Sequence, residues 1–394
     1  MHTTVVRQIQ GDEMLEVMYA LTAYAFHPSP PLTNKAEWQE VVRQRQQATY
    51  VALFEDGVPV ATAASSPLTQ QVRGALFGAG GIWGVVTAPG ARRKGYSRRT
   101  LTELLSTLRE AGQAVTCLYP FRESFYERLG YVTFALPLIA RLTPSALRPL
   151  LEKDLGGQVD VVLIGDGFET YRDYLHRLRN RTHGMALFDH GDTHRAQRNN
   201  LWQACARVDG ELVGVMLYEL RGEEISRFDL RASRFYYDTS QGKYLLLQWL
   251  ARHVDQAHRI EMWLPPFERP ETWLADIEVK LESQVRAPMG RVLDVARIGG
   301  MQTGPGHFTA SLSDPLCPWN EGNWLFETRE GALHVSPSTT ADCALTIQAL
   351  SALVYGTHPP GDFAIRGWGS PSLAVQAVLQ AMFPPLTPYL HEYF

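Results

Sequence analysis

A short basic segment stands between an apolar stretch and a leucine-rich stretch, and its residue types suit the binding of an anion. It reads GVVTAPGARRKGYS over residues 84–97. Val85 and Val86 predict a strand, and leucines at 101, 104, 105 and 108 have the spacing of a helix with one buried face. A strand, a glycine turn and a helix N-terminus direct backbone N–H groups and the positive end of the helix dipole at one spot. The segment therefore predicts a site that fits a pyrophosphate group.

The cations of this segment strengthen the prediction. The pattern is neither GxxxxGK[ST] nor GxGxxG, so neither a magnesium-dependent nucleotide loop nor a dinucleotide fingerprint is predicted. The alternative is a solvated basic turn that caps an ordinary helix, which the residues downstream disfavour. The cations are Arg92, Arg93, Lys94, Arg98 and Arg99.

Composition is typical of a soluble enzyme with several domains. The chain has 394 residues, of which 45% are hydrophobic, and a net charge of −4. At roughly 100–200 residues per domain, two to four domains are expected. The charge disfavours nucleic acid as a partner, no apolar run approaches the roughly 20 residues of a membrane span, and residues 1–10 lack a signal-peptide core. We therefore expect a cytoplasmic protein.

Metal binding is not expected. The four cysteines lie far apart without zinc spacing. A polar stretch in the middle of the chain is rich in histidine and aspartate, but its spacing matches no compact zinc motif. Its members are His183, Asp189, His190, Asp192 and His194.

The first block of the chain, residues 1–140, predicts alternating helices and strands. Glu13–Phe26 has the pattern of a helix, which the proline-rich residues 27–31 end. Tyr50–Ala64 predicts a hairpin whose turn is Asp56-Gly57. With a further strand at Val115–Tyr119, the block predicts an α/β (α+β) class.

The second block, residues 141–286, repeats the first without its cations. EDGVPVATA returns as VDGELVGVM and VTCLYPF returns as IEMWLPPF, each roughly 150 residues downstream. Three cations of the first block align with neutral residues that follow Asp238, so the second copy should bind pyrophosphate poorly. We interpret it as a degenerate copy that serves as a scaffold. The aligned positions are Arg92, Arg93 and Lys94 in the first block and Thr239, Ser240 and Gln241 in the second.

The third block, residues 287–394, predicts strands followed by a helix at Ile347–Tyr355. This order, with the motif LxIxALxxLxxG and a final helix, resembles the sterol-carrier-protein fold. Such a fold can hold lipid, although apolar strands and helices also form ordinary cores. The expected strands are Phe308–Leu312, Trp324–Thr328, Ala332–Ser336 and Cys343–Ile347.

Taken together, the blocks resemble the enhanced-intracellular-survival (Eis) acetyltransferases of the GNAT superfamily, over essentially the whole chain. The motifs that carry the resemblance are VVTAPxxRRKGY, SFYERLGY and an aromatic residue at position 394. The resemblance implies two tandem GNAT-like domains, a sterol-carrier-like domain, acetyl-CoA as co-substrate and a hexamer. It also implies that Tyr126 is the general acid and that the α-carboxylate of Phe394 is the general base.

The resemblance also assigns the acetyl-CoA site. One strand would pair with pantetheine, the basic loop would wrap the pyrophosphate, and a later turn would close over the cofactor near the thioester. The residues for pantetheine are Val85, Val86 and Thr87; those for the pyrophosphate are Arg92, Arg93, Lys94, Gly95, Tyr96, Ser97 and Arg98; those of the turn are Phe121 and Arg122.

These roles are chemically reasonable. An amine that attacks a thioester must lose a proton, and the departing thiolate gains one. A tyrosine, with a pKa of about 10, can donate to a thiolate whose thiol has a pKa of about 8.5. A terminal carboxylate is ionised at neutral pH, and burial would raise its pKa and make it a better base.

The chemistry of the reaction predicts what should line the acceptor cleft. An amine is cationic before it reacts, so carboxylates or aromatic faces should line its cleft; aminoglycosides, polyamines and lysine-type amines all remain open. Two rival functions are an N-acyltransferase of peptide N-termini with a longer acyl-CoA, and a non-catalytic CoA- or lipid-binding protein. The candidate acceptor residues are Asp12, Glu13, Glu37, Trp38 and Glu392.

Overall fold

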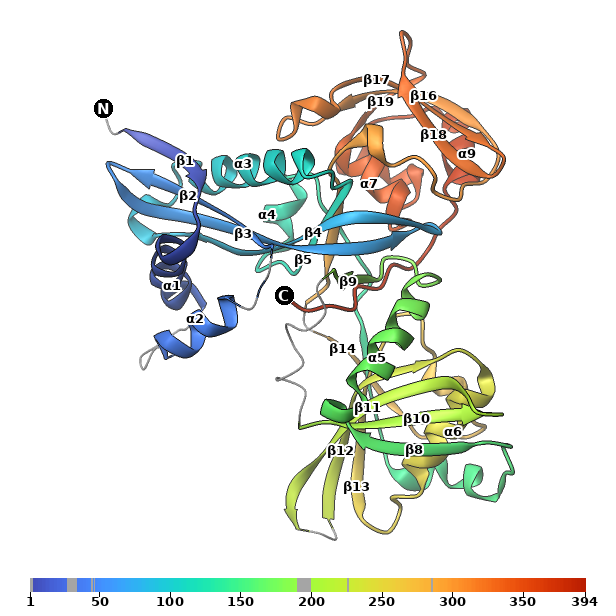
Figure 1. Cartoon of the computed structure of the whole chain (residues 1–394). Coiled ribbons are helices and arrows are strands. Elements are labelled where there is room, and N and C mark those ends of the chain that lie inside the picture. The colour runs from blue at the N-terminus through green and yellow to red at the C-terminus, as the bar shows by residue number, and fades with distance from the viewer. Residues whose placement is uncertain are drawn as a thin grey trace. The chain divides into compact units, whose positions relative to one another are not determined.

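The chain divides into two units of mixed α/β structure (Figure 1). The computed structural model describes residues 3–26, 34–43, 45, 47–189, 200–224, 227–284 and 286–394. Unit 1 comprises Met1–Phe134, Asn180–Thr193 and Pro288–Phe394, and unit 2 comprises Ala135–Arg179 and His194–Ala287. The expected α/β (α+β) class is confirmed.

A mixed sheet forms the frame of unit 1. Its strands follow the order β1-β2-β3-β4-β5-β15-β6, and β9 pairs with β3. The neighbours are antiparallel except β4 and β5, which run parallel. The strands are β1 (Thr4–Gln8), β2 (Thr49–Glu55), β3 (Val58–Val72), β4 (Ala75–Thr87), β5 (Val115–Leu118), β6 (Val132–Thr133), β9 (Ala186–Phe188) and β15 (Met289–Val292).

Helices cover both faces of this sheet. Figure 1 shows α3 (Tyr96–Glu110) on one face and α1 (Gly11–Phe26) on the other. The leucines of α3 are buried, as their spacing predicts. The predicted β2–β3 turn is confirmed, since Asp56 and Gly57 both have positive φ, as a type I′ turn requires. Two shorter helices, α2 (Lys35–Arg43) and α4 (Glu123–Glu127), complete this region; the predicted helix break at residues 27–31 lies outside the described residues.

Two strands of the sheet come from distant parts of the sequence. β15, from the start of the predicted third block, lies between β5 and β6. β9, from the predicted second block, pairs with β3. The sheet that holds β4 and β5 is therefore completed by later segments of the chain.

The rest of unit 1 is built on a second sheet of order β18-β17-β16-β19. The strands predicted from the sequence are confirmed, and α7 ends at Gly356, which has φ +71°. Helix α7 is buried and packs against β15, which joins the two sheets of unit 1. The elements are β16 (His307–Ser313), β17 (Gly322–Arg329), β18 (Ala332–Pro337), β19 (Cys343–Thr346), α7 (Ile347–Tyr355), α8 (Phe363–Arg366) and α9 (Leu373–Met382).

Unit 2 has a sheet of order β14-β7-β13-β12-β11-β10-β8. The sequence repeat predicts a hairpin, a helix and a strand, and unit 2 has these as β10 with β11, α6 and β13. In addition, β12 pairs in parallel with β13, as β4 does with β5. The hairpin turn again has two residues of positive φ, Asp209 and Gly210. The elements are β7 (Leu138–Leu142), β8 (Gln158–Leu163), β10 (Trp202–Val208), β11 (Glu211–Glu224), β12 (Arg227–Tyr237), β13 (Ala257–Leu264), β14 (Lys280–Ser283), α5 (Ile164–Arg179) and α6 (Ser240–Ala251).

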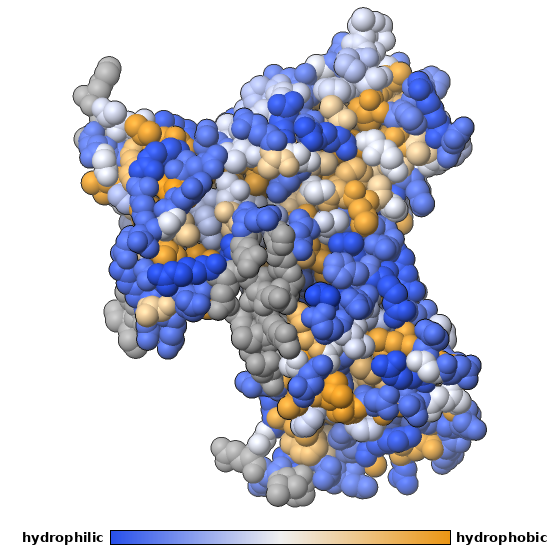
Figure 2. Space-filling view, in the orientation of Figure 1, coloured by the Kyte–Doolittle hydropathy of each residue, from blue (hydrophilic) through white to orange (hydrophobic). Residues whose placement is uncertain are grey.

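Hydrophilic residues cover much of the face drawn in Figure 2. Within the described part of the chain, no helix is long and apolar enough to span a membrane.

Candidate active site

The sheet of unit 1 splits between its two parallel strands. β4 pairs with β5 only over Ala79–Ile82, although β4 continues to Thr87 and stays paired with β3 on its other edge. The β3–β4 register shifts beside Gly84, which has φ +60°. Among the described residues, no strand pairs with the β5-facing edge of β4 beyond Ile82. An extended ligand can add to such an edge as a strand does.

The basic loop leads from this edge to an uncapped helix N-terminus. The N-cap of α3 is Gly95, with φ +77° and no side-chain capping bond. Its first N–H groups therefore remain available to an anion, and the helix dipole favours negative charge there. The predicted succession of a strand, a glycine turn and a helix N-terminus is therefore present.

Glu55 holds part of the loop in place. Its carboxylate accepts from Lys94 Nζ at 2.9 Å and from the buried Tyr96 hydroxyl at 2.5 Å. Lys94 and Tyr96, both predicted to bind the cofactor, are thus already bound to a carboxylate. Sequence reasoning missed Glu55, which stands beside the turn of the predicted hairpin.

The other predicted cations differ in their partners. Arg92 Nε donates to the carbonyl of Thr87 at 3.4 Å, and Arg98 donates to the carbonyl of Pro315 at 3.2 Å. Arg93 is exposed and forms no hydrogen bond or ion pair with any residue that the structure describes. Arg93 is therefore the loop cation with the least competition for an anion.

Nearer the strand, the hydroxyls of Thr87 and Ser97 lie 2.6 Å apart. This contact ties the end of β4 to the first turn of α3. Val86 is buried, while Val85 and Thr87 are half-buried.

Tyr126 lies on α4 inside an aromatic cluster and is only 4% exposed. Its ring packs edge-on against Phe121, Phe125 and Tyr131, at centroid distances of 5.8, 4.9 and 5.8 Å. Burial raises the pKa of Tyr126 well above its ordinary value. The phenol is therefore protonated at neutral pH, the state that a general acid requires. Phe121 is 63% exposed and Arg122 is exposed at the N-terminus of α4.

The C-terminal segment returns to the sheet of unit 1 (Figure 1). The Phe394 ring packs against Tyr119 and Phe188, at centroid distances of 5.9 and 6.4 Å. A Cβ placed on Gly81 of β4 would lie 3.0 Å from the Phe394 ring and 2.8 Å from the Leu68 side chain, so a larger residue there would force these neighbours to shift. The tail therefore reaches β4 beside the point where β4 and β5 separate.

Tyr126 and Phe394 lie on opposite faces of the sheet. Ile82 packs in one cluster with Tyr126 and the leucines of α3. Gly81, which meets Phe394, is the adjacent residue of β4 and so points to the other face. The split between β4 and β5 thus separates a phenol on one face from the end of the tail on the other.

Arg73 anchors this tail to the sheet. It stands at the β3–β4 turn, is 4% exposed, and has φ +47°. Its guanidinium donates at 2.8 Å to the carbonyls of Leu353, Val354 and Pro384. One arginine therefore caps α7 and fixes the first part of the tail.

His183 provides a second anchor. Its Nδ1 accepts from the Arg73 backbone N–H at 3.1 Å, and its Nε2 lies 3.0 Å from the carbonyl of Tyr355. Its own carbonyl accepts from the N–H of Tyr389 at 2.9 Å. Burial lowers the pKa of His183 to about 4, so the imidazole is neutral. Sequence reasoning placed His183 in a polar loop and missed this role.

Unit 2 has a capped helix N-terminus where unit 1 has the uncapped N-terminus of α3. The N-cap of α6 is Thr239, whose hydroxyl accepts from the N–H of Gly242 at 3.0 Å. The helix thus satisfies its own N-terminus, and Asp238 adds a negative charge next to it.

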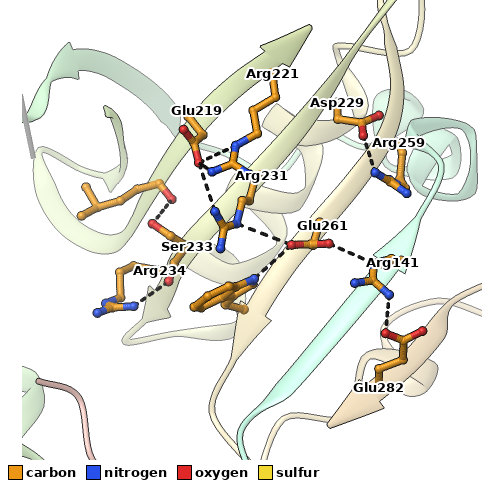
Figure 3. Close-up of polar contacts among 12 residues, drawn as sticks. Arg141, Glu219, Arg221, Asp229, Arg231, Ser233, Arg234, Arg259, Glu261 and Glu282 are labelled. Carbon is orange, nitrogen blue, oxygen red and sulfur yellow. Dashed lines mark hydrogen bonds and ion pairs between the residues drawn. The ribbon is translucent and has the colours of Figure 1, made fainter. Parts of the chain in front are cut away.

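Several arginines of unit 2 are instead paired across its sheet. Figure 3 shows Glu219, Arg231, Glu261 and Arg141, which stand opposite one another on successive strands. Their ion pairs measure 3.4, 3.5 and 2.9 Å, and Arg141 also pairs with Glu282. Cations held in this way stabilise the sheet rather than offer an anion site.

The remaining candidates are dispersed. The described residues contain no group of three or more histidine, cysteine or carboxylate side chains that could hold a metal ion; His190, Asp192 and His194 lie outside them. The acceptor candidates fall on three elements: Asp12 and Glu13 on α1, Glu37 and Trp38 on α2, and Glu392, which is buried, in the tail. Glu13 is paired with Arg7.

Comparison with known domains identifies two parts of the chain. Residues 5–134 match the acetyltransferase (GNAT) domain model, and residues 300–391 match the sterol carrier protein domain model. No curated protein matches the chain.

Solved structures share the fold over the whole chain. A conserved protein of Enterococcus faecalis has 20% identity and a TM-score of 0.83, with 100% of each chain covered. A GCN5-related N-acetyltransferase of Anabaena variabilis has 14% identity and a TM-score of 0.83, also with 100% of each chain covered. Eis1 of Mycobacterium abscessus has 16% identity and a TM-score of 0.79, again with 100% of each chain covered. The chain is therefore an acyltransferase that carries a GNAT acetyltransferase domain at residues 5–134 and a sterol-carrier-protein domain at residues 300–391.

Proposed function

We propose that this chain is an acetyl-CoA-dependent N-acetyltransferase of the Eis type, which moves acetyl to a primary amine. The observation that carries the proposal is the split between β4 and β5, with an uncapped helix N-terminus at one end and the tail beside it. A thioester held in the split is accessible from both faces of the sheet.

The loop of unit 1 would hold the co-substrate. The free edge of β4 at Val85, Val86 and Thr87 would pair with the pantetheine arm. The N–H groups of α3 and the side chain of Arg93 would bind the pyrophosphate, with Arg92 and Arg98 beside them. Phe121 and Arg122 would lie over the cofactor near the thioester.

The two faces of the sheet would divide the proton transfers. In a chain that ends at Phe394, its α-carboxylate accepts a proton from the amine, whose nitrogen forms a bond to the acetyl carbon. The carbon–sulfur bond then breaks, and the Tyr126 hydroxyl donates its proton to the leaving thiolate. Each group typically contributes 10²- to 10⁴-fold to the rate.

The acceptor is an amine, and aminoglycosides, polyamines and lysine-type or peptidyl amines are the candidate classes. We further propose that the protein acts in the cytoplasm as a homo-oligomer, a hexamer by its resemblance to the Eis enzymes. Unit 2 would serve as a scaffold without bound acetyl-CoA.

A thiol-release assay with acetyl-CoA against these amines tests the proposal. Wild-type enzyme should turn over at least one of them, and Tyr126→Phe should lower kcat by about 10²-fold or more. Tyr131→Phe is the matched control, because it also removes a buried hydroxyl from the aromatic cluster around Tyr126. The Tyr131 hydroxyl lies 2.9 Å from the hydroxyl of Thr116. Equal loss in both variants, or none in Tyr126→Phe, would remove Tyr126 from the mechanism.

A further inference from the structure

Arg45 is a cation with no anionic partner among the described residues. It lies between α2 and β2, and its guanidinium carbon is 4.0 Å from the centroid of the Trp83 ring. Its Nε and Nη1 atoms are buried, and neither has a hydrogen-bond partner among the described residues. A guanidinium stacked on an indole still needs acceptors for the N–H groups along its edge. Such donors are costly to leave buried and unpaired.

A second unpaired donor packs on the same indole. The Tyr50 ring meets Trp83 edge-on at 5.7 Å, and its buried hydroxyl has no partner in the described part of the chain. Burial raises the pKa of Tyr50 to about 12, so this hydroxyl is a donor at neutral pH. Burial lowers the pKa of Arg45, but a guanidinium keeps its charge.

The position of Trp83 links these groups to the proposed reaction. Trp83 and Gly81 are two residues apart on β4, so they share one face and are separated by roughly 7 Å along the strand. Gly81 is the residue that meets the Phe394 ring. Arg45 therefore stands on the face of the sheet from which, under the proposed function, the amine attacks.

We propose that Arg45 binds a carboxylate of the acceptor, so that the substrate is a small amine that carries a carboxylate, as an amino acid does. This inference rests on the proposed function and narrows its acceptor class. A carboxylate can accept charge-assisted hydrogen bonds from the unpartnered guanidinium nitrogens, and the Tyr50 hydroxyl supplies a further donor. Polyamines and aminoglycosides, by contrast, bring positive charge towards Arg45 and leave its donors unpaired.

The test compares amino acids with their carboxamides, such as leucine with leucinamide and lysine with lysinamide, by thiol release from acetyl-CoA. The wild type should favour the acid by about 10- to 100-fold in kcat/KM, the value of one charge-assisted contact. Arg45→Gln should bring this ratio close to one by slowing the acid alone, and Arg45→Lys should retain part of it. Arg43→Gln is the matched control, because Arg43 is an exposed cation two residues away on α2.

Equal kcat/KM for acid and amide in the wild type would overturn the inference, and so would an unchanged acid-to-amide ratio in Arg45→Gln. Either result would leave the proposed acetyltransferase function intact. If no amine is turned over, the proposed function fails separately. Calorimetry of leucine binding to the wild type and to Arg45→Gln, with CoA present, then tests whether Arg45 binds a carboxylate. Tighter binding to the wild type supports a carboxylate at Arg45, and equal or absent binding overturns it.

Discussion

Replacing Arg73 by alanine should loosen the C-terminal tail and lower turnover without changing acetyl-CoA binding. Three carbonyl groups lose a charged donor at 2.8 Å, and two of them belong to the last turn of α7. A hydrogen bond from a charged group contributes roughly 1.5–3 kcal/mol, although water can partly replace it. We therefore expect the free energy of unfolding of unit 1 to fall by about 3–5 kcal/mol.

Urea unfolding and steady-state kinetics measure the two effects. Arg73→Ala should lower kcat by about tenfold or more, because its contact with Pro384 holds the tail that leads to Phe394. The dissociation constant of acetyl-CoA should not change. Arg329→Ala is the control, since the 61%-exposed Arg329 side chain of unit 1 pairs only across the surface; it should shift stability by less than about 0.5 kcal/mol. Arg73→Ala with wild-type stability and kcat would refute the reasoning.

Three further perturbations test other parts of the site. Arg93→Ala should weaken acetyl-CoA binding by about tenfold or more in calorimetry. Lys94→Ala should weaken it less, because Lys94 already pairs with Glu55. A larger loss in Lys94→Ala than in Arg93→Ala would contradict the role proposed for Arg93 in the basic loop. Gly81→Val should lower kcat with little change in acetyl-CoA affinity, because a Cβ at this position lies 2.8 Å from Leu68 and 3.0 Å from Phe394. Gly78→Ala is the control and should be tolerated, because a Cβ on Gly78 has no neighbour closer than 3.7 Å. Finally, unfolding stability should fall by about 3 kcal/mol as the pH drops from 6.5 to 4, since unfolded His183 takes up a proton there that the folded state, with a pKa of about 4, does not. This stability is fully present above pH 6.5, and a slope that His183→Gln leaves unchanged would assign the effect to other groups.

The local elements of the fold could be predicted because each has a signature within one stretch of sequence. The spacing of the leucines in α3 predicts the buried face of that helix. Asp56-Gly57 predicts the turn between β2 and β3, since few residues adopt two successive positive φ angles. The basic loop could be predicted for the same reason, because strand, glycine and helix are adjacent in the chain.

Contacts between distant segments could not be predicted in this way. β15 joins the first sheet from a position far downstream, and nothing in the sequence of Met289–Val292 specifies β5 as its partner. Arg73 and His183 appear in the sequence as an ordinary turn residue and a loop histidine, and their role arises only when α7 and the tail pack against them. The partners of the loop cations depend on the same tertiary packing, as Glu55 shows for Lys94.

The most direct test of the proposed mechanism is to convert the α-carboxylate of Phe394 to a carboxamide by semisynthesis, with the ring kept in place. Thiol release should then fall by about 10²- to 10⁴-fold while the dissociation constant of acetyl-CoA stays at the wild-type value, because a carboxamide packs alike but cannot accept the proton of the amine. Full turnover by the carboxamide would show that the tail only packs against β4 and that the base lies elsewhere.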